Sequence, residues 1–452
     1  MRRRINVLLI CCCAFAAFGR EEYTRDFRKT VPLSGGRTFR IEHSLGNITI
    51  RTQSKNEVDI AATIRCSADN GQDARDCADR IQIHVDEAGG GVAVRTEYPQ
   101  NGSYFGHRNM GYSVNYDITM PESAPLELRN SFGRVSVSGL HAGSTIHNGN
   151  GRVEFSSGRG IQRIENTFGD VIVMGNDGDV TVVNGNGRVE ARDITGALDI
   201  RDRFGEIHVM NAGKTVNING GNGRVEVINA GGLTTITNSF GPVNASQVKA
   251  DLNVRNQNGS VEATDISGTA DLHTSFGPVR FARIGRALRV NAQNSNVTGD
   301  TVGESATLET TFGGIDVRNV KGGTRATAAN SSIRMAYIGG EAYARTSFAG
   351  VTIEDAGGPI TVENQNGTVM ADARTARSCQ PISLRTSFGP IRVTLPSSVG
   401  YNLMANTSFG RIQSQPEVTV SGSLGRDQLS GKIRGGGCEL RLMDQNGNID
   451  IL

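Results

Sequence analysis

Hydrophobic and polar residues alternate in short segments along most of this chain, and the segments recur at a fixed interval. Within residues 130–147, for example, Val135 and Val137 belong to one alternating segment and Thr145-Ile146 to the next. Alternation with a period of two, rich in β-branched residues, indicates strands, and the intervening Asn, Gly, Ser and Asp residues favour turns. Each 18-residue unit is therefore expected to form two strands and two turns.

One position of the repeat alternates between two residue types. Phe recurs every 36 residues, usually followed by Gly, and Asn stands halfway between successive Phe residues. The members of this Phe–Asn column are Phe132, Asn150, Phe168, Asn186, Phe204, Asn222, Phe240, Asn258, Phe276, Asn294, Phe312, Asn330, Phe348 and Asn366. No insertion interrupts the count from Asn130 to about Asp372. So strict a period predicts an all-β parallel β-helix, or solenoid, because stacked coils must keep one length.

Parallel strands about 4.8 Å apart would make this stack a rod of roughly 16 coils and 75 Å. A seven-bladed propeller is the alternative, since the seven Phe residues could mark seven blades. Propeller blades usually have about 40 residues or more. The same G-x-V-x-V pattern also follows both Phe and Asn, which a four-stranded antiparallel blade does not explain. The half-repeat therefore favours the solenoid.

The Phe–Asn column is expected to form a structural ladder within the stack. Stacked Asn side chains can bond to one another, and the Phe rings are expected to fill a deeper pocket in a thin core of Val, Ile, Ala and Leu. The Gly that follows suits a turn with positive φ. Arg and Glu in the NGRVE segments (150–154, 186–190 and 222–226) are expected to be solvated charges on outward strand positions.

The N-terminus has the pattern of a secretory signal: three Arg residues, an apolar run from Ile5 to Phe18, then small residues. The run is too short to span a bilayer, so no membrane span is expected after cleavage. It contains Cys11, Cys12 and Cys13, but Ile10 is a poor fit to a lipoprotein signal. Four Cys residues remain after export, and an even number suggests disulfides. Among the three possible connectivities we favour Cys66 with Cys77 and Cys379 with Cys438.

The regular period covers only the middle of the chain. We expect a signal peptide at 1–19, an N-terminal capping β-rich region with a short helix at 20–128, the regular solenoid at 129–375, and irregular C-terminal coils and a cap at 376–452. The helix is expected near Asp69 to Arg80. Strands are expected at Ile81 to Val85, Val92 to Thr96 and Ser113 to Met120. Such regions cap the open ends of the stack, where backbone groups would otherwise be unpaired.

Neither the charge nor the motifs of the chain indicate catalysis. The formal net charge is +2, so nucleic acid is not expected as a partner. The sequence has no nucleophile elbow, zinc-protease motif, C-x-x-C or phosphate-binding loop. Residues 175–179 (GNDGD) are similar to a calcium β-roll turn, but such rolls need Asp in nearly every turn. We therefore expect no catalytic, cofactor-binding or metal-binding residues.

Two segments resemble the bacterial putative-adhesin family of exported β-solenoid proteins: Val114 to Leu140, and Gly431 to Leu452 with its Gly-rich bend and NGNI final strand. The resemblance covers nearly all of the mature chain and supplies no binding residues. It implies a non-enzymatic, adhesin-like protein of the cell envelope that presents a repetitive surface for binding or scaffolding. The alternatives are a polysaccharide-binding or polysaccharide-degrading β-helix and a periplasmic sensor or regulatory partner.

The expected partner is a surface or envelope ligand, either protein or glycan, and the chain itself is expected to be a monomer. Its expected location is the periplasm, the outer-membrane surface or the extracellular space.

Overall fold

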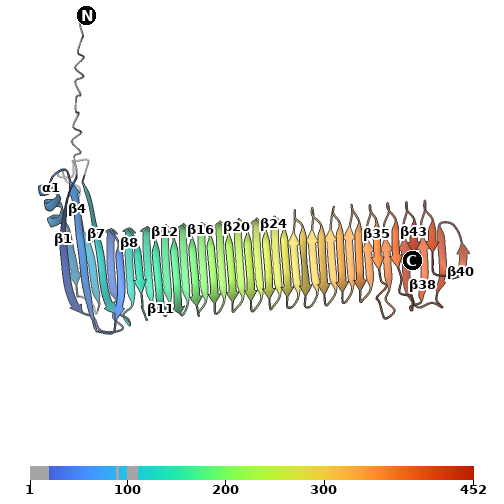
Figure 1. Cartoon of the computed structure of the whole chain (residues 1–452), viewed down its shortest axis with the longest axis horizontal. Coiled ribbons are helices and arrows are strands. Elements are labelled where there is room, and N and C mark those ends of the chain that lie inside the picture. The colour runs from blue at the N-terminus through green and yellow to red at the C-terminus, as the bar shows by residue number, and fades with distance from the viewer. Residues whose placement is uncertain (1–19, 88–90, 99–109) are drawn as a thin grey trace, which may run out of the picture.

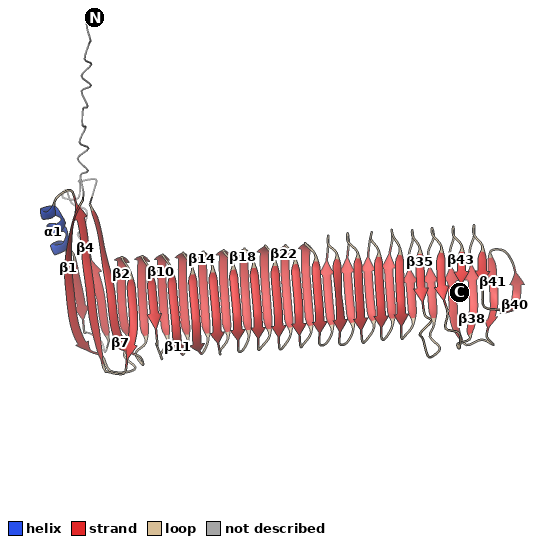
Figure 2. Ribbon diagram, in the orientation of Figure 1, coloured by secondary structure: helices blue, strands red, loops and turns tan. Residues whose placement is uncertain are grey.

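A computed structural model describes residues 20–87, 91–98 and 110–452. The predicted signal peptide, with Cys11 to Cys13, and most of the loop between Tyr98 and Tyr112 lie outside these residues. The described chain forms a long straight rod with its strands lying across the rod axis (Figure 1). Figure 2 shows that the rod is almost entirely strand, with one short helix, α1 (Gly71–Arg80), at its N-terminal end. The predicted all-β solenoid is confirmed.

The strands form two sheets, which we call sheet A and sheet B. In each sheet, the strands are given below in their order along the rod, so that neighbours are hydrogen-bonded to each other. Sheet A runs β1 (Glu21–Pro32), β4 (Glu57–Ala68), β7 (Gly111–Pro121), β3 (Ile48–Gln53), β9 (Val135–Ser138), β11 (Val153–Arg159), β13 (Val171–Asp177), β15 (Val189–Ile194), β17 (Ile207–Ala212), β19 (Val225–Ala230), β21 (Val243–Val248), β23 (Val261–Ile266), β25 (Val279–Ile284), β27 (Val297–Val302), β29 (Ile315–Val320), β31 (Ile333–Ile338), β33 (Val351–Ala356), β35 (Val369–Asp372), β37 (Ile391–Thr394), β43 (Ile449–Ile451) and β39 (Ile412–Ser414).

Sheet B is built in the same way from the alternate strands. It runs β5 (Gln82–Asp86), β6 (Val92–Glu97), β2 (Phe39–Leu45), β8 (Leu126–Phe132), β10 (Ser144–Asn150), β12 (Gln162–Phe168), β14 (Val180–Asn186), β16 (Leu198–Phe204), β18 (Val216–Asn222), β20 (Thr234–Phe240), β22 (Leu252–Asn258), β24 (Ala270–Phe276), β26 (Leu288–Ala292), β28 (Ala306–Thr310), β30 (Thr324–Ala328), β32 (Ala342–Thr346), β34 (Ile360–Glu363), β36 (Ile382–Arg385), β42 (Cys438–Met443), β38 (Tyr401–Asn406), β41 (Gln428–Ile433) and β40 (Val418–Leu424).

Each strand of the regular region pairs in parallel with the strand one coil away. Val153 of β11, for example, lies between Val135 and Val171, which are 18 residues before and after it. Inward residues of the two sheets form a continuous narrow core of Val, Ile, Leu and Ala. This spacing reproduces the predicted 18-residue coil of two strands and two turns.

Two Phe side chains enter the core of the regular coils beside a glycine that makes room for the ring. Phe155 is fully buried, and a Cβ on Gly158 would lie 2.3 Å from its ring. Phe281 is buried in the same way, and a Cβ on Gly299, one coil further on, would lie 2.6 Å from that ring. Because the distance between the sheets is uniform along the rod, a large residue must be offset by a small neighbour.

The N-terminal strands extend both sheets beyond the regular coils. The antiparallel strands β7, β4 and β1 continue sheet A, and β6 and β5 continue sheet B. Helix α1 packs against β1 and β4, and Asn70 caps its N-terminus by accepting from the Asp73 backbone N–H at 2.9 Å. The helix expected near Asp69 to Arg80 is therefore present, and it covers the end of the stack, where an exposed edge would invite pairing.

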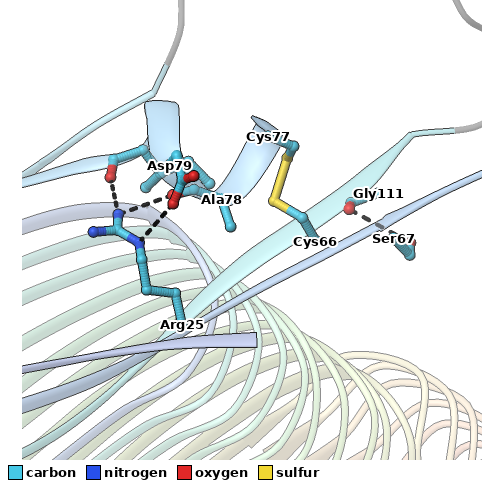
Figure 3. The surroundings of a disulfide bond; sticks show 8 residues. Arg25, Cys66, Ser67, Cys77, Ala78, Asp79 and Gly111 are labelled. Carbon is cyan, nitrogen blue, oxygen red and sulfur yellow. Dashed lines mark hydrogen bonds and ion pairs between the residues drawn. A yellow bond between two sulfur atoms is a disulfide. The ribbon is translucent and has the colours of Figure 1, made fainter. Parts of the chain in front are cut away.

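A disulfide joins this helix to the sheet beneath it. Cys77 of α1 is bonded to Cys66 of β4 (Figure 3). Beside it, the Arg25 guanidinium donates to the backbone oxygens of Ala78 and Ile81 at 2.8 and 2.5 Å. Because Ala78 and Ile81 are at the C-terminal end of the helix, Arg25 satisfies carbonyls that have no partner within it.

The C-terminal coils break the sequence period but remain in register with the stack. Ile360 pairs with Ile382, 22 residues later, and Ile391 pairs with Ile449. The antiparallel strands β41 and β40 end sheet B. A second disulfide, Cys379 to Cys438, joins the long connection after β35 to β42. Both disulfides favoured from the sequence are thus present in the structure.

Candidate binding surface

The Phe residues of the Phe–Asn column lie on the outside of the rod. All seven are between 47% and 56% exposed, so the predicted burial of the Phe rings in the core is wrong. Residues of the column pair in register from coil to coil, as Asn150 does with Phe132 and Phe168. The column therefore forms a line of alternating Phe and Asn side chains along one edge of the rod, which we call the Phe–Asn stripe.

The stripe continues where the sequence period ends. Phe388 pairs with Asn366, and it is 55% exposed. Asn446 follows in space: its backbone N–H donates to the Ser387 carbonyl, as that of Asn366 donates to Ser347. The next coil brings Phe409, whose backbone N–H donates to the Gln445 carbonyl at 2.8 Å. Alternation of Phe and Asn is thus kept in space even where the chain reaches the coils out of sequence order.

A second column, two residues earlier in each coil, explains why the Phe rings point outward. We call it the buried turn column. Its members are His43, Asn130, Asn148, Asn166, Asn184, Asp202, Gly220, Asn238, Asn256, Thr274, Ala292, Thr310, Ala328, Thr346, Asn364, Thr386 and Asp444. Each is the last buried residue before its stripe residue, so the inward and outward alternation ends there and the stripe residue stays exposed.

The Asn side chains of the buried turn column hold the turn closed from inside. Asn148 Nδ2 donates to the Gly151 carbonyl and to Asn166 Oδ1 in the next coil, both at 3.1 Å. Asn184 Nδ2 donates to the Gly187 carbonyl at 2.9 Å in the same way. These amides therefore bond to backbone carbonyls on the inner side of the turn. The sequence signal for this column is a small or polar residue, most often Asn, two residues before the Phe or Asn of the stripe.

The Asn residues of the stripe do not bond to one another, because Phe residues separate them. Instead, Asn258, Asn294 and Asn366 direct Nδ2 toward the carbonyl of a Ser in the preceding coil, at 3.4 to 3.5 Å. Their other amide atoms remain at the surface. The predicted Asn ladder is therefore found in the buried turn column and not in the stripe, since only there do Asn residues stand in consecutive coils.

Gly151 shows why glycine follows the stripe residue. Its φ is +133°, and a Cβ there would lie 2.1 Å from the Gly133 carbonyl oxygen of the preceding coil. Its N–H donates to the Phe168 carbonyl at 2.7 Å, which links neighbouring turns along the stripe. Glycine is thus required here both by the backbone conformation and by the close approach of two coils.

The two halves of the stripe differ in charge on the flank next to sheet A. The residues two positions after each stripe residue lie on this flank. They are mostly charged in the N-terminal half of the stripe and uncharged in the C-terminal half. In coil order they are Arg134, Arg152, Asp170, Arg188, Glu206, Arg224, Pro242, Ser260, Pro278, Asn296, Gly314, Ser332, Gly350 and Thr368. On the side of sheet B, the residue directly before each stripe residue is Ser, Thr, Gly, Gln or Ala, with a single charged residue, Arg203.

A groove of about 550 Å³ lies beside the stripe, on the outer side of sheet B. Its lining includes Gly149 and the ion pair of His147 with Glu165, at 2.9 Å, but no Phe of the stripe. Within the stripe itself, the Asn coils carry no ring, so the Phe side chains form a row with Asn between them.

Charged residues of the NGRVE segments lie on the outer face of sheet A, where they form ion pairs across coils. Arg152, for example, lies 3.3 Å from Glu154 in its own coil and 3.2 Å from Asp170 in the next. Exposed pairs of this kind contribute little to stability. The pattern fits the solvated charges expected from the sequence.

Three titratable side chains of the buried turn column have shifted pKa values. Burial lowers the pKa of His43 to about 4, and its Nδ1 lies 3.0 Å from Thr96 Oγ1. Burial also raises the pKa of Asp202 to about 7. The pKa of Asp444 is raised for the same reason. These groups are part of the core of the turn and do not converge on one cleft.

The residues that the structure describes contain no group of three or more His, Cys, Asp or Glu placed to hold a metal ion. Nor do they include a helix long and apolar enough to cross a membrane. The fold and surface together define a β-solenoid repeat protein with one continuous aromatic stripe.

Residues 214–452 match the family described as Toastrack DUF4097, which covers more than half of the chain. The protein belongs to this family, in agreement with the resemblance seen in its sequence.

No curated protein matches the chain. Among solved structures, a putative cell adhesion protein from Clostridium sporogenes is similar, with 10% sequence identity over 95% of this chain and 99% of that one. The TM-score of that superposition is 0.16. A likeness of this degree carries no argument about the present chain.

Proposed function

We propose that this protein is a non-enzymatic, exported component of the cell envelope whose rod binds a ligand along the Phe–Asn stripe. The observation that carries the proposal is the stripe itself: seven half-exposed Phe rings in line on one edge. Exposed apolar residues of ordinary surfaces are scattered singly, whereas apolar side chains gathered along one edge mark interaction sites. Export is supported by the signal-like N-terminus and by two disulfides, which persist in oxidising compartments.

Binding is tested by co-sedimentation of the mature chain with isolated envelope fractions. The informative variant replaces Phe204, Phe240 and Phe276 with Ser. A matched control replaces Ile161, Leu233 and Tyr337, three exposed apolar residues outside the stripe, with Ser. We expect the stripe variant to lose binding and the control to keep it. Equal binding by both variants would show that the stripe is not the binding surface.

Location is tested by protease treatment of intact cells, with the protein followed by an antibody to its C-terminal region. Loss of signal from intact cells would place the rod on the outer surface. Protection until the outer membrane is opened would make it periplasmic. A signal that stays with the cytosolic fraction would refute export.

Polysaccharide is the second candidate ligand, because rings and amides alternate along the stripe. Aromatic faces stack on the apolar faces of sugars, and amides hydrogen-bond to hydroxyl groups. Purified polysaccharides therefore belong in the same co-sedimentation assay. Turnover of any of them that survives repurification of the protein would replace the non-enzymatic proposal by the degrading alternative.

A further inference from the structure

We propose that the partner of the Phe–Asn stripe is a second copy of this chain, bound antiparallel about a two-fold axis between the Phe240 and Asn258 coils. The inference rests on the proposed role of the stripe as the binding surface. It differs from the monomer expected from the sequence.

Self-pairing follows first from the shape of the stripe. Phe rings recur every second coil, about 9.6 Å apart, which is twice the spacing of parallel strands. The Asn coils between them have no ring, and in the N-terminal half they also carry Gly149, Gly185 or Gly221 on the sheet B flank. Two stripes shifted by one coil can thus place the rings of each into the gaps of the other.

Symmetry then selects the antiparallel arrangement. A two-fold axis parallel to the rods would set each Phe opposite its own copy, with no shift. A parallel pair shifted by one coil would leave the two copies in unequal environments, whereas most homo-oligomers have closed point-group symmetry. An axis perpendicular to the rods allows the one-coil shift and still closes the pair.

One position of that axis uses the whole regular stripe. With the axis between the coils of Phe240 and Asn258, every regular Phe faces an Asn of the other copy. The opposed residues are Phe132 with Asn366, Phe168 with Asn330, Phe204 with Asn294, Phe240 with Asn258, Phe276 with Asn222, Phe312 with Asn186 and Phe348 with Asn150. At each end, Phe388 stands opposite Leu45, which occupies the stripe position next to Phe132.

The same axis also separates like charges. It preserves the flanks, so the residues next to sheet A face their counterparts in the other copy. Arg134 then lies opposite Thr368, Arg152 opposite Gly350, Asp170 opposite Ser332, Arg188 opposite Gly314, Glu206 opposite Asn296 and Arg224 opposite Pro278. Each charged residue of the N-terminal half meets an uncharged one. On the other flank Arg203 meets Gln293.

The buried area is sufficient for a stable pair. An aromatic side chain buries roughly 150–250 Å² in full, so half-exposed rings leave roughly 75–125 Å² each. Seven such rings give roughly 500–900 Å² on each copy from the Phe residues alone. Stable interfaces bury about 800 Å² per partner.

Sedimentation velocity of the mature chain, residues 20–452, between about 1 and 100 µM tests the pairing. We expect a dimer. The Phe204→Ser/Phe240→Ser/Phe276→Ser variant should dissociate at a concentration roughly a hundred-fold higher or more, because it removes central apolar contacts from both copies. Circular dichroism checks that the variant is folded. The Ile161→Ser/Leu233→Ser/Tyr337→Ser control should remain dimeric.

Cysteine cross-linking tests the direction and register. A mixture of Asn150→Cys and Phe348→Cys chains should form an intermolecular disulfide on mild oxidation. A mixture of Asn150→Cys and Phe168→Cys chains should not, since those positions meet only in a parallel pair shifted by one coil. Cross-linking of the second mixture alone would refute the antiparallel arrangement.

A wild-type chain that remains monomeric at the highest concentration, or a dimer that survives the triple Phe substitution, would overturn the self-pairing. In either case the envelope assay of the same variant decides separately whether the stripe binds another ligand. A monomer whose stripe variant loses envelope binding would leave the proposed function standing. A stripe-dependent dimer with no envelope binding by any variant would confine the stripe to self-association.

Discussion

Replacing Asp202 with Asn should stabilise the rod at neutral and alkaline pH. Asp202 stands in the buried turn column, where most coils have a neutral residue, and it is 4% exposed. The next coil has Gly220 at this position, which offers no side chain as a partner. Burial raises the pKa of Asp202 to about 7 from 3.8. Asn has the same shape and no charge, and it occupies this position in the preceding coil as Asn184.

The size and direction of the effect follow from the pKa of Asp202. Because the folded pKa is higher than the unfolded one, the folded protein binds the proton more tightly, and stability falls as pH rises from about 4 to about 7. A shift of about 3 units at 1.36 kcal/mol per unit gives an upper bound of about 4 kcal/mol. The gain from Asp202→Asn should therefore be near zero at pH 4 and approach that bound at pH 8.

The assay is urea unfolding at pH 4, 6 and 8, combined with hydrogen exchange of β14, β16 and β18. Local exchange is needed because repeat proteins do not unfold in a single cooperative step. The matched control is Asp271→Asn, an exposed outward residue of β24, which should show no pH-dependent gain. A gain that is the same at pH 4 and pH 8, or a loss of stability at pH 8, would refute the reasoning.

Three further predictions concern the turns and the N-terminal end. Gly151→Ala should lower stability by about 3 kcal/mol or more, since the positive φ and the neighbouring carbonyl both oppose a Cβ, whereas Gly143→Ala should be tolerated in the same urea titration. Asn148→Ala should cost about 1–3 kcal/mol through lost amide bonds, against less than about 0.5 kcal/mol for the exposed Asn150→Ala. Because the pKa of His43 is lowered to about 4, its contribution to folding stability is present above pH 6.5 and is lost as the pH falls toward 4. Hydrogen exchange of β2 and β6 should therefore accelerate over that pH range, and the acceleration should be smaller in His43→Gln. An equal loss of stability in Gly151→Ala and Gly143→Ala, or in Asn148→Ala and Asn150→Ala, would contradict the first two predictions. Hydrogen exchange of β2 and β6 that does not depend on pH would contradict the third.

The sequence predicted the solenoid because coil length is a property of the backbone. Alternating segments of β-branched residues indicate strands wherever they occur, and an uninterrupted 18-residue period permits only stacking in register. Helix α1 was also predicted, with a starting point two residues early. Strand β1 was not, because Glu21–Pro32 is mostly polar, with apolar residues only at Tyr23, Phe27, Val31 and Pro32, and it becomes a strand through pairing with β4. Strand propensity in such a segment depends on its neighbours.

The candidate surface was located by the sequence but placed on the wrong side of the sheet. Leu126, Leu128 and Asn130 are the inward residues of β8, and Phe132 continues this series two residues later. Alternation alone would therefore place Phe132 in the core. The alternation ends at Asn130, however: it is the last buried residue of β8, and Phe132 is 54% exposed. The shifted pKa of Asp202 was equally hidden, since it depends on burial between coils 18 residues apart.

The sequence by itself determined the coil length, the direction of stacking, the position of the stripe in each coil and the set of cysteines that bond. Each of these follows from local backbone geometry or from the count of residues. Tertiary structure alone decided that the Phe rings face solvent, that Phe388, Asn446 and Phe409 extend their line, and which polar groups are buried. Exposure is set by where the chain bends and by what the neighbouring coils place against each side chain, and neither is encoded in the period.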